Sequence, residues 1–259
     1  MQPQTAPIRG VLSIAGYDPS GGAGILADIK TFEQTGSYGC GVISAITYQN
    51  DFEFKGVKWL PLTEINNQFE ALASRFNFQF AKIGLVQNIE MLKFCIEMLK
   101  KYNPAIKIIW DPVMKATAGY DFGNGFSFNA IKPILKDIYL ITPNIHEMVK
   151  LLPATNAEDA AAELSMYCNV LLKGGHKEGS QAVDVLYQKK KTTGFVSEKI
   201  KGMDKRGTGC VLSSALTAYL DGGETLENAC NKAKKYTLNY IKSSDSRLGL
   251  HANHTNTIV

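Results

Sequence analysis

The chain of 259 residues has no uninterrupted apolar run of about 18 residues, the length that a membrane-spanning helix requires. Met1–Gly10 also lacks the apolar core of a signal peptide. No block of basic residues stands out, because the lysines are spread along the chain and the formal net charge is only +4. These absences predict a cytoplasmic protein with neither a membrane nor a nucleic acid as its partner.

Cysteine is scarce, and no C-x-x-C pair is present, which argues against a zinc or redox centre. The five cysteines are widely scattered: Cys40, Cys95, Cys168, Cys210 and Cys230. We expect free thiols, four of which behave as small buried hydrophobes. Cys210 stands apart because of its position.

Hydrophobic side chains make up 45% of the chain, enough for a large core within one domain. Short β-rich runs alternate with amphipathic helical stretches, which predicts an α/β fold whose sheet is fed by crossover helices. The strands are nearly continuous in apolar residues, as in parallel sheets covered on both faces. Expected strands are 11–15, 41–47, 81–84, 106–110, 138–141, 169–172 and 182–187, and expected helices are 22–35, 64–75, 89–102, 157–166, 211–221 and 225–242.

Two further segments are predicted from composition alone. After Ser243 the chain turns polar and loses its periodicity, so we expect a loosely held tail over residues 244–259. The glycine-rich stretch Gly119–Gly125 is either a mobile loop near a ligand or a plain turn.

Glycine first concentrates in Gly16–Gly24, between the first strand and a helix. This stretch matches neither a Walker A loop nor a dinucleotide-binding fingerprint. A turn at this place either contacts a ligand or only admits close packing, and the residues leave both interpretations open.

A second glycine-rich motif, Gly207-Thr208-Gly209-Cys210, precedes the helical stretch VLSSALTAYL. Glycines at a helix N-terminus leave backbone N–H groups free to bind an anion, such as a phosphate in transfer. In the first turn, the helix dipole is expected to lower the pKa of the Cys210 thiol and make it a proton acceptor. The alternative is an ordinary buried cysteine.

Polar residues follow three other expected strands. Asp111 and Glu147 are candidates for holding Mg²⁺, directly or through water, because carboxyl ends of parallel strands face the ligand crevice. Glu147 has an alternative role in a capping box with Asn144. Lys173, beside Gly174, is placed either to reach a phosphate or to be solvated in a turn.

Taken in order, the motifs resemble the hydroxymethylpyrimidine and phosphomethylpyrimidine kinases of thiamine synthesis, within the ribokinase-like superfamily. The resemblance spans roughly Val11 to Tyr240. It rests on Ala15–Gly24 (A-G-x-D-P-S-G-G-A-G), Ala27–Phe32 (A-D-I-K-T-F), Gln49-Asn50, Lys82-Ile83-Gly84, Asp111–Met114 (D-P-V-M), Thr142-Pro143-Asn144, Lys173–His176 (K-G-G-H) and Gly207–Cys210 (G-T-G-C).

The resemblance implies a three-layer α/β/α sandwich with a mostly parallel sheet, usually dimeric, that uses ATP and Mg²⁺. One kinase domain would cover residues 11–243, after a short extension 1–10. The implied reaction phosphorylates 4-amino-5-hydroxymethyl-2-methylpyrimidine and then its monophosphate, which yields the diphosphate for thiamine diphosphate synthesis.

The resemblance also implies roles for individual residues. The G-T-G-C motif would be catalytic, with Cys210 in the place that related sugar kinases give to an aspartate base. A carboxamide such as that of Gln49 can donate to a ring nitrogen while accepting from an exocyclic amine, which suits an aminopyrimidine. The remaining assignments are Gly16, Asp28, Thr47 and Leu85 for the substrate, Lys173, Gly174, Asn144 and Thr208 for the nucleotide, and Asp111 and Glu147 for the metal.

Three positions depart from the family pattern: Arg206 replaces the usual histidine before Gly207, Leu85 replaces a frequent methionine, and Tyr48 replaces a small residue. An arginine at 206 would either add a phosphate contact or change only the surface of the loop, and we favour the second. The main alternative function is a pyridoxal or pyridoxine kinase of the same superfamily, against which Gln49 argues. A catalytically silent ligand-binding protein is the remaining alternative.

Overall fold

In the computed structural model, which describes residues 6–115, 119–122, 125–175, 180–200, 202 and 204–251, one sheet has the strand order β3-β2-β1-β4-β5-β6-β7-β8-β9. The six strands from β2 to β7 in this order run parallel. Antiparallel strands complete both edges. The bounds are β1 (Ile8–Tyr17), β2 (Gly39–Gln49), β3 (Phe54–Trp59), β4 (Phe76–Ile83), β5 (Lys107–Trp110), β6 (Leu140–Ile141), β7 (Asn169–Leu172), β8 (Gln181–Gln188) and β9 (Lys191–Glu198).

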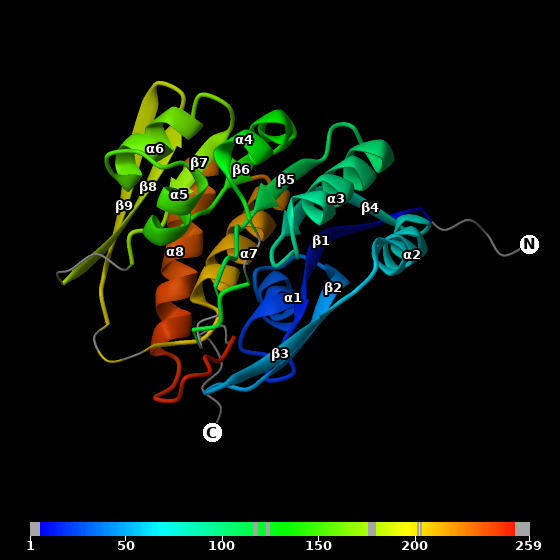
Figure 1. Cartoon of the computed structure of the whole chain (residues 1–259). Coiled ribbons are helices and arrows are strands. Elements are labelled where there is room, and N and C mark those ends of the chain that lie inside the picture. The colour runs from blue at the N-terminus through cyan, green and yellow to red at the C-terminus, as the bar shows by residue number, and fades with distance from the viewer. Residues whose placement is uncertain are drawn as a thin grey trace, which may run out of the picture.

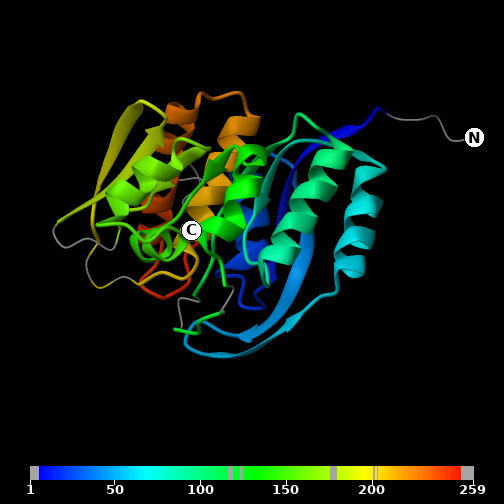
Figure 2. The same ribbon diagram turned by 45° about the horizontal axis from the view of Figure 1, so that its top comes forward.

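Helices cover both faces of the sheet, which makes three layers (Figures 1 and 2). One face carries α1 (Gly24–Gln34), α7 (Thr208–Asp221) and α8 (Leu226–Lys242). The other face carries α2 (Leu62–Ala73), α3 (Ile89–Tyr102), α4 (Phe128–Ile131), the 3₁₀ helix η1 (Lys132–Asp137), α5 (Ile145–Leu151) and α6 (Ala157–Leu164). The predicted α/β/α sandwich is therefore confirmed.

The core lies between these layers, and the strand pleat distributes it over both faces. Consecutive residues of a strand point to opposite sides of a sheet. Accordingly, Ile108 packs into the cluster beneath α2 and α3, whereas Ile109 packs into the cluster beneath α7 and α8. This two-sided burial explains why the central strands read as continuous apolar runs.

All seven predicted strands and all six predicted helices are present, with bounds that shift by a few residues. The strands β3 and β9 were not predicted, because they lie at the sheet edges and contain many polar residues. The short helices α4 and α5 and the 3₁₀ helix η1 also escaped prediction, since a few turns carry too little periodicity. Among the described residues, no helix has the length and apolar character to cross a membrane.

The segment 244–251 is attached to the domain, unlike the loose tail that its composition predicts. Lys205 donates hydrogen bonds to two backbone carbonyls within it. The ring of His251 lies 4.8 Å from that of Tyr240 on α8. In Figure 1 this red segment folds back beneath α8. Parts of Gly119–Gly125 and of the tail lie outside the described residues.

Candidate active site

The predicted site residues gather at one edge of the sheet, where the parallel strands end. Asp111 follows β5, Lys173 follows β7, and Gln49 is the last residue of β2. The N-terminus of α7 lies against this edge, because a Cβ on its second residue, Gly209, would stand 3.2 Å from the Lys173 ammonium nitrogen. Such an edge is where open α/β sheets bind ligands.

Asp111 is the centre of a buried polar cluster. Its Oδ1 accepts hydrogen bonds from Thr142 Oγ1 at 3.1 Å and from Lys173 Nζ at 2.8 Å. Its Oδ2 accepts from Ser213 Oγ on α7 at 3.2 Å. Burial alone would raise the pKa of Asp111, but the positive charges of Lys173 and Lys82 hold this pKa below its ordinary value. Asp111 therefore stays ionised.

Lys173 joins the two candidate metal-binding carboxylates. Its ammonium nitrogen lies 2.8 Å from Asp111 Oδ1 and 3.8 Å from Glu147 Oε2. Burial opposes the charged form of Lys173, but the charges of Asp111 and Glu147 prevail and raise its pKa. Because Gly209 has no side chain, this ammonium reaches the first turn of α7. A fixed positive charge thus stands beside the helix N-terminus.

Glu147 forms the predicted capping box at the start of α5. Asn144 Oδ1 accepts from the Glu147 amide at 2.9 Å, and Glu147 Oε2 accepts from the Asn144 amide at 2.7 Å. Burial, chiefly, raises the pKa of Glu147 to about 7, and the nearby charge of Asp111 adds to this shift. Both residues thus have a structural role that leaves Glu147 next to Lys173.

The carboxylates of Asp111 and Glu147 fit a hydrated divalent cation carried by nucleotide phosphates. Mg²⁺ usually binds through one or two carboxylates, with phosphates and water as its other ligands. Since Asp111 already accepts from three side chains, a contact through water fits better than direct coordination. The described residues contain no cluster of three or more histidine, cysteine, aspartate or glutamate side chains around a common point.

Asp28 occupies a second buried cluster and not an open pocket. Its Oδ1 accepts from Lys82 Nζ at 2.5 Å and Ser214 Oγ at 2.7 Å, and its Oδ2 accepts from Ser13 Oγ at 2.6 Å. Asp28 and Lys82 are both 0% exposed. The structure therefore gives Asp28 the role of buried counter-ion of Lys82, and its assignment to the substrate stays a prediction.

Cys210 lies in the first turn of α7 and is half-buried, whereas the other four cysteines are buried. The expected lowering of its pKa is wrong for the unliganded protein. Burial is the largest cause that raises this pKa to about 11, and the charges of Asp28 and Asp111 add to the effect. Lys82 and a backbone hydrogen bond with Gly24 oppose it. The thiol is thus protonated at neutral pH, because desolvation outweighs the helix dipole.

The two glycine motifs lie against each other. Gly207, the N-cap of α7, has a φ of +68°, and a Cβ at this position would stand 2.1 Å from the Gly22 carbonyl oxygen. Only glycine fits both conditions. The Asp18 carboxylate holds the first loop closed by accepting from the amides of Ser20 and Ala23. The two motifs therefore form one continuous backbone surface at the N-terminus of α7.

Four of the residues predicted to bind the substrate, Gly16, Thr47, Gln49 and Leu85, lie at or just after the carboxyl ends of β1, β2 and β4. A Cβ on Gly16 would meet Leu85 Cδ2 at 2.9 Å, so these two residues are in contact. Thr47 Oγ1 donates to the Tyr17 carbonyl at 2.8 Å and accepts from Gln49 Nε2 at 2.9 Å. These contacts hold the Gln49 carboxamide in one orientation at the end of β2.

Gly174 has a structural role in the unliganded chain. Its amide donates to Asp184 Oδ1 at 2.9 Å, and a Cβ would stand 1.9 Å from the Val183 carbonyl oxygen. Asp184 in turn forms a 2.7 Å ion pair with Lys234 on α8. The nearby His176 lies outside the described residues.

Lys82, Thr142 and Ser213 were not predicted as site residues, although the first two belong to the quoted motifs. The signal that could have marked Lys82 is a charged residue in an otherwise buried strand, since buried charges need partners. Ser213 carries no such signal. Its role depends on α7 approaching Asp111, which the local sequence does not encode.

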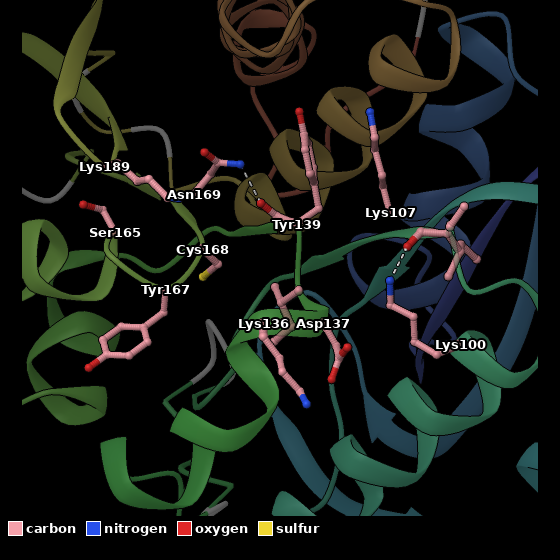
Figure 3. Close-up of a pocket in the computed structure, with 13 residues that line it drawn as sticks. Lys100, Lys107, Lys136, Asp137, Tyr139, Ser165, Tyr167, Cys168, Asn169 and Lys189 are labelled. Carbon is pink, nitrogen blue, oxygen red and sulfur yellow. Dashed lines mark hydrogen bonds between the residues drawn. The ribbon is translucent and has the colours of Figure 1, made fainter.

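A cavity of about 300 Å³ lies at the other end of the parallel strands, and none of these residues lines it (Figure 3). It lies at the N-terminal ends of β5 and β7. Its Lys100 donates to the Ile106 carbonyl, and Lys107 extends toward the rings of Phe80 and Tyr139. We therefore keep this cavity separate from the candidate active site.

Comparison with known proteins supplies independent information. The phosphomethylpyrimidine kinase family matches residues 18–256. A hydroxymethylpyrimidine/phosphomethylpyrimidine kinase from Aquifex aeolicus is 36% identical over 242 residues, which cover 90% of this chain and 94% of that protein. The thiamine biosynthesis bifunctional protein ThiED from Geobacter sulfurreducens is 35% identical over 89% of this chain, which spans 48% of that protein.

Solved structures give the same fold. Phosphomethylpyrimidine kinase from Clostridium difficile aligns with a TM-score of 0.71 and 37% identity, covering 89% of this chain and 98% of that chain. Pyridoxal kinase from Staphylococcus aureus, in complex with AMP-PCP, aligns with a TM-score of 0.79 and 28% identity, covering 92% and 89%.

Proposed function

The chain belongs to the phosphomethylpyrimidine kinase family, and from this premise we propose that it phosphorylates 4-amino-5-hydroxymethyl-2-methylpyrimidine with ATP. A second transfer converts the monophosphate into the diphosphate, which serves thiamine diphosphate synthesis. The names of the relatives support this substrate, and the AMP-PCP complex of the pyridoxal kinase supports ATP as the donor.

One observation carries the proposal: Lys173, Asp111 and Cys210 meet at the N-terminus of α7. A fixed ammonium group and the first amides of a helix lie together here, which supports this end of α7 as the place of phosphoryl transfer. Both features favour a multiply charged anion. A sulfhydryl lies in the same helical turn, within the electrostatic influence of Lys82.

In the proposed mechanism, the amides of the first turn of α7 hold the transferring group while Lys173 offsets its charge. Because the Cys210 thiol is protonated in the unliganded protein, it first releases its proton to solvent, and the thiolate Sγ then accepts the proton of the substrate hydroxymethyl oxygen. Its thiolate form is favoured by Lys82 and by the Gly24 hydrogen bond. Because phosphoryl transfer passes through a loose transition state, positioning and electrostatics matter more than the strength of this base.

Asp111 and Glu147 would hold Mg²⁺ through water. When bound, the ion supplies positive charge that the phosphate oxygens share. Lys173 already stands between these two carboxylates and provides part of that charge in the unliganded protein.

A pyridoxal kinase is the second candidate, favoured by the TM-score of 0.79 with the Staphylococcus aureus enzyme. Gln49 separates the two functions. Its carboxamide keeps one N–H and one lone pair free, which matches a ring nitrogen beside an amino group. Pyridoxal presents a phenolic oxygen and a ring nitrogen in a different arrangement.

The test is a mass-resolved product assay with Mg-ATP and, in parallel, the hydroxymethylpyrimidine, its monophosphate and pyridoxal. We expect the pyrimidine diphosphate from both pyrimidines. Pyridoxal phosphate as the sole product would overturn the assignment in favour of the second candidate. No product from any acceptor would indicate a ligand-binding protein without catalytic activity. Homodimer formation stays a prediction, which light scattering of the purified chain checks.

A further inference from the structure

Arg206 is buried beside the candidate active site. The prediction from the sequence, that this arginine changes only the surface of its loop, is therefore wrong. Its side chain is 2% exposed. The amide donates to the Arg247 carbonyl at 2.8 Å, and the carbonyl accepts from Tyr240 Oη at 3.0 Å. A Cβ on Gly22 would stand 3.2 Å from Arg206 Cβ. These contacts fix the residue between the two glycine motifs.

The Arg206 guanidinium points at the predicted pyrimidine-binding residue. Its Nη2 donates to Gln49 Oε1 at 2.5 Å. Because arginine only donates hydrogen bonds, this contact sets the orientation of the amide, with the oxygen toward Arg206 and the nitrogen toward Thr47. Arg206 therefore positions Gln49 for any ligand of the pocket.

The rest of this guanidinium is unused. Arg206 Nε and Nη1 are buried and have no hydrogen-bond partner within the described residues. Unpaired buried donors are costly, and a charged group with open donors is costlier still. The carboxylate of the neighbouring Asp18 does not pair with it, since it accepts from Ser20 and Ala23. A ligand with several acceptor oxygens would satisfy these donors.

The position of Arg206 indicates which part of a ligand meets it. The residue directly precedes Gly207, the N-cap of α7, whose first amides hold the transferring phosphoryl group in the proposed mechanism. Cys210, the proposed base, follows four positions later in the first turn of α7, so Arg206 lies near the reacting end of the acceptor. A neutral hydroxymethyl group offers little to an open guanidinium, whereas a phosphate monoester offers several anionic oxygens.

We propose that Arg206 is a specificity-determining residue that binds the phosphate of the phosphorylated acceptor and so favours the second transfer over the first. This inference rests on the proposed function. Bidentate binding through Nε and Nη1 would pair both open donors with one phosphate. Burying a guanidinium with unpaired donors is unfavourable in the unliganded protein, and only the bound monophosphate would remove this free-energy penalty.

The experiment compares kcat/KM for the hydroxymethylpyrimidine and for its monophosphate in the wild-type chain, in Arg206→Met and in Arg206→Lys. Methionine keeps the apolar length of the side chain, and lysine keeps the charge without the planar fork. The matched control is Arg247→Met, which removes a positive charge close enough to act on Arg206, although the Arg247 guanidinium is exposed over the Phe52 ring at 4.9 Å. Its backbone bond to Arg206 does not depend on the side chain.

We expect Arg206→Met to lower kcat/KM for the monophosphate about 10- to 100-fold more than for the hydroxymethylpyrimidine, the usual effect of lost charge-assisted hydrogen bonds. Arg206→Lys should lie between, and Arg247→Met should keep the wild-type ratio. An unchanged ratio in Arg206→Met would overturn the inference, as would an equal loss with both acceptors.

A second readout measures the dissociation constant of the monophosphate by calorimetry without ATP. A weakening in Arg206→Met that exceeds the change for the hydroxymethylpyrimidine supports phosphate binding, whereas equal changes indicate a structural role and refute it. Arg206→Lys serves if the methionine variant does not fold. The proposed function fails separately: a wild-type chain that phosphorylates neither pyrimidine would remove both that function and this assignment.

Discussion

The Asp28→Asn substitution tests whether Asp28 acts as the buried counter-ion of Lys82. Asparagine keeps the shape but removes the charge, which leaves the 0% exposed ammonium without its partner at 2.5 Å. Breaking a buried ion pair from one side costs about 3–5 kcal/mol. In a domain of this size, 1 kcal/mol corresponds to about 2–4 °C. We therefore expect the Tm to fall by roughly 6–20 °C in scanning calorimetry.

The pair also sets the pH range of this effect. Burial opposes the charge of Lys82, but Asp28, the strongest of the opposing causes, helps raise its pKa above the ordinary 10.5. Stability from a raised pKa is present below the ordinary pKa and is lost as pH rises through the folded value. The difference in Tm between wild type and Asp28→Asn should therefore be constant from about pH 6 to 9 and shrink only in more alkaline solution.

Two further variants make the result decisive. Asp28→Asn combined with Lys82→Met removes both charges and should recover part of the lost stability, which a double-mutant cycle measures. Glu53→Gln is the matched surface control, because its 2.9 Å pair with Lys55 is exposed and should contribute little. A Tm for Asp28→Asn within about 2 °C of wild type would refute the counter-ion role.

The remaining predictions concern the phosphate half of the site and its scaffold. In the unliganded chain, the rate at which iodoacetamide alkylates Cys210, monitored by mass spectrometry, should increase with pH up to a pKa of about 11. A rate that already levels off below pH 9 would contradict the argument from burial. Cys210→Ala should lower kcat about 10²-fold or more in the product assay, and an unchanged kcat would exclude the proton-transfer role. Lys173→Met should lower kcat/KM for ATP by roughly 10²- to 10³-fold, the range for removing one group that stabilises transition-state charge. A raised KM for ATP with an unchanged kcat would instead indicate that Lys173 only binds the nucleotide. Gly174→Ala should destabilise the fold by about 1–3 kcal/mol in denaturant unfolding, because its Cβ would stand 1.9 Å from the Val183 carbonyl. Gly175→Ala, which meets nothing within 4 Å, is the control that should keep wild-type stability.

Much of the fold was predictable because local pattern and tertiary burial agree in the central strands. The stretch 108–110 is apolar because both of its faces are covered, so composition alone marks it as part of an inner strand. The edge strands β3 and β9 face water and lack this pattern. The segment 244–251 reads as a polar tail, yet it is held by Lys205 and by ring contacts of His251. None of these partners is nearby in sequence.

By itself, the sequence determined the inner strands of the sheet, the residue types at their carboxyl ends and the glycines that allow the two motifs to touch. It did so because strand period, helix period and backbone freedom are local properties. Only the tertiary structure decided that Asp28 pairs with Lys82, that Arg206 is buried against Gln49 and that the Cys210 thiol stays protonated. Each of these depends on which charges and how much water surround a group, and such surroundings come from residues far apart in the sequence, such as Gln49 and Arg206, which are 157 positions apart.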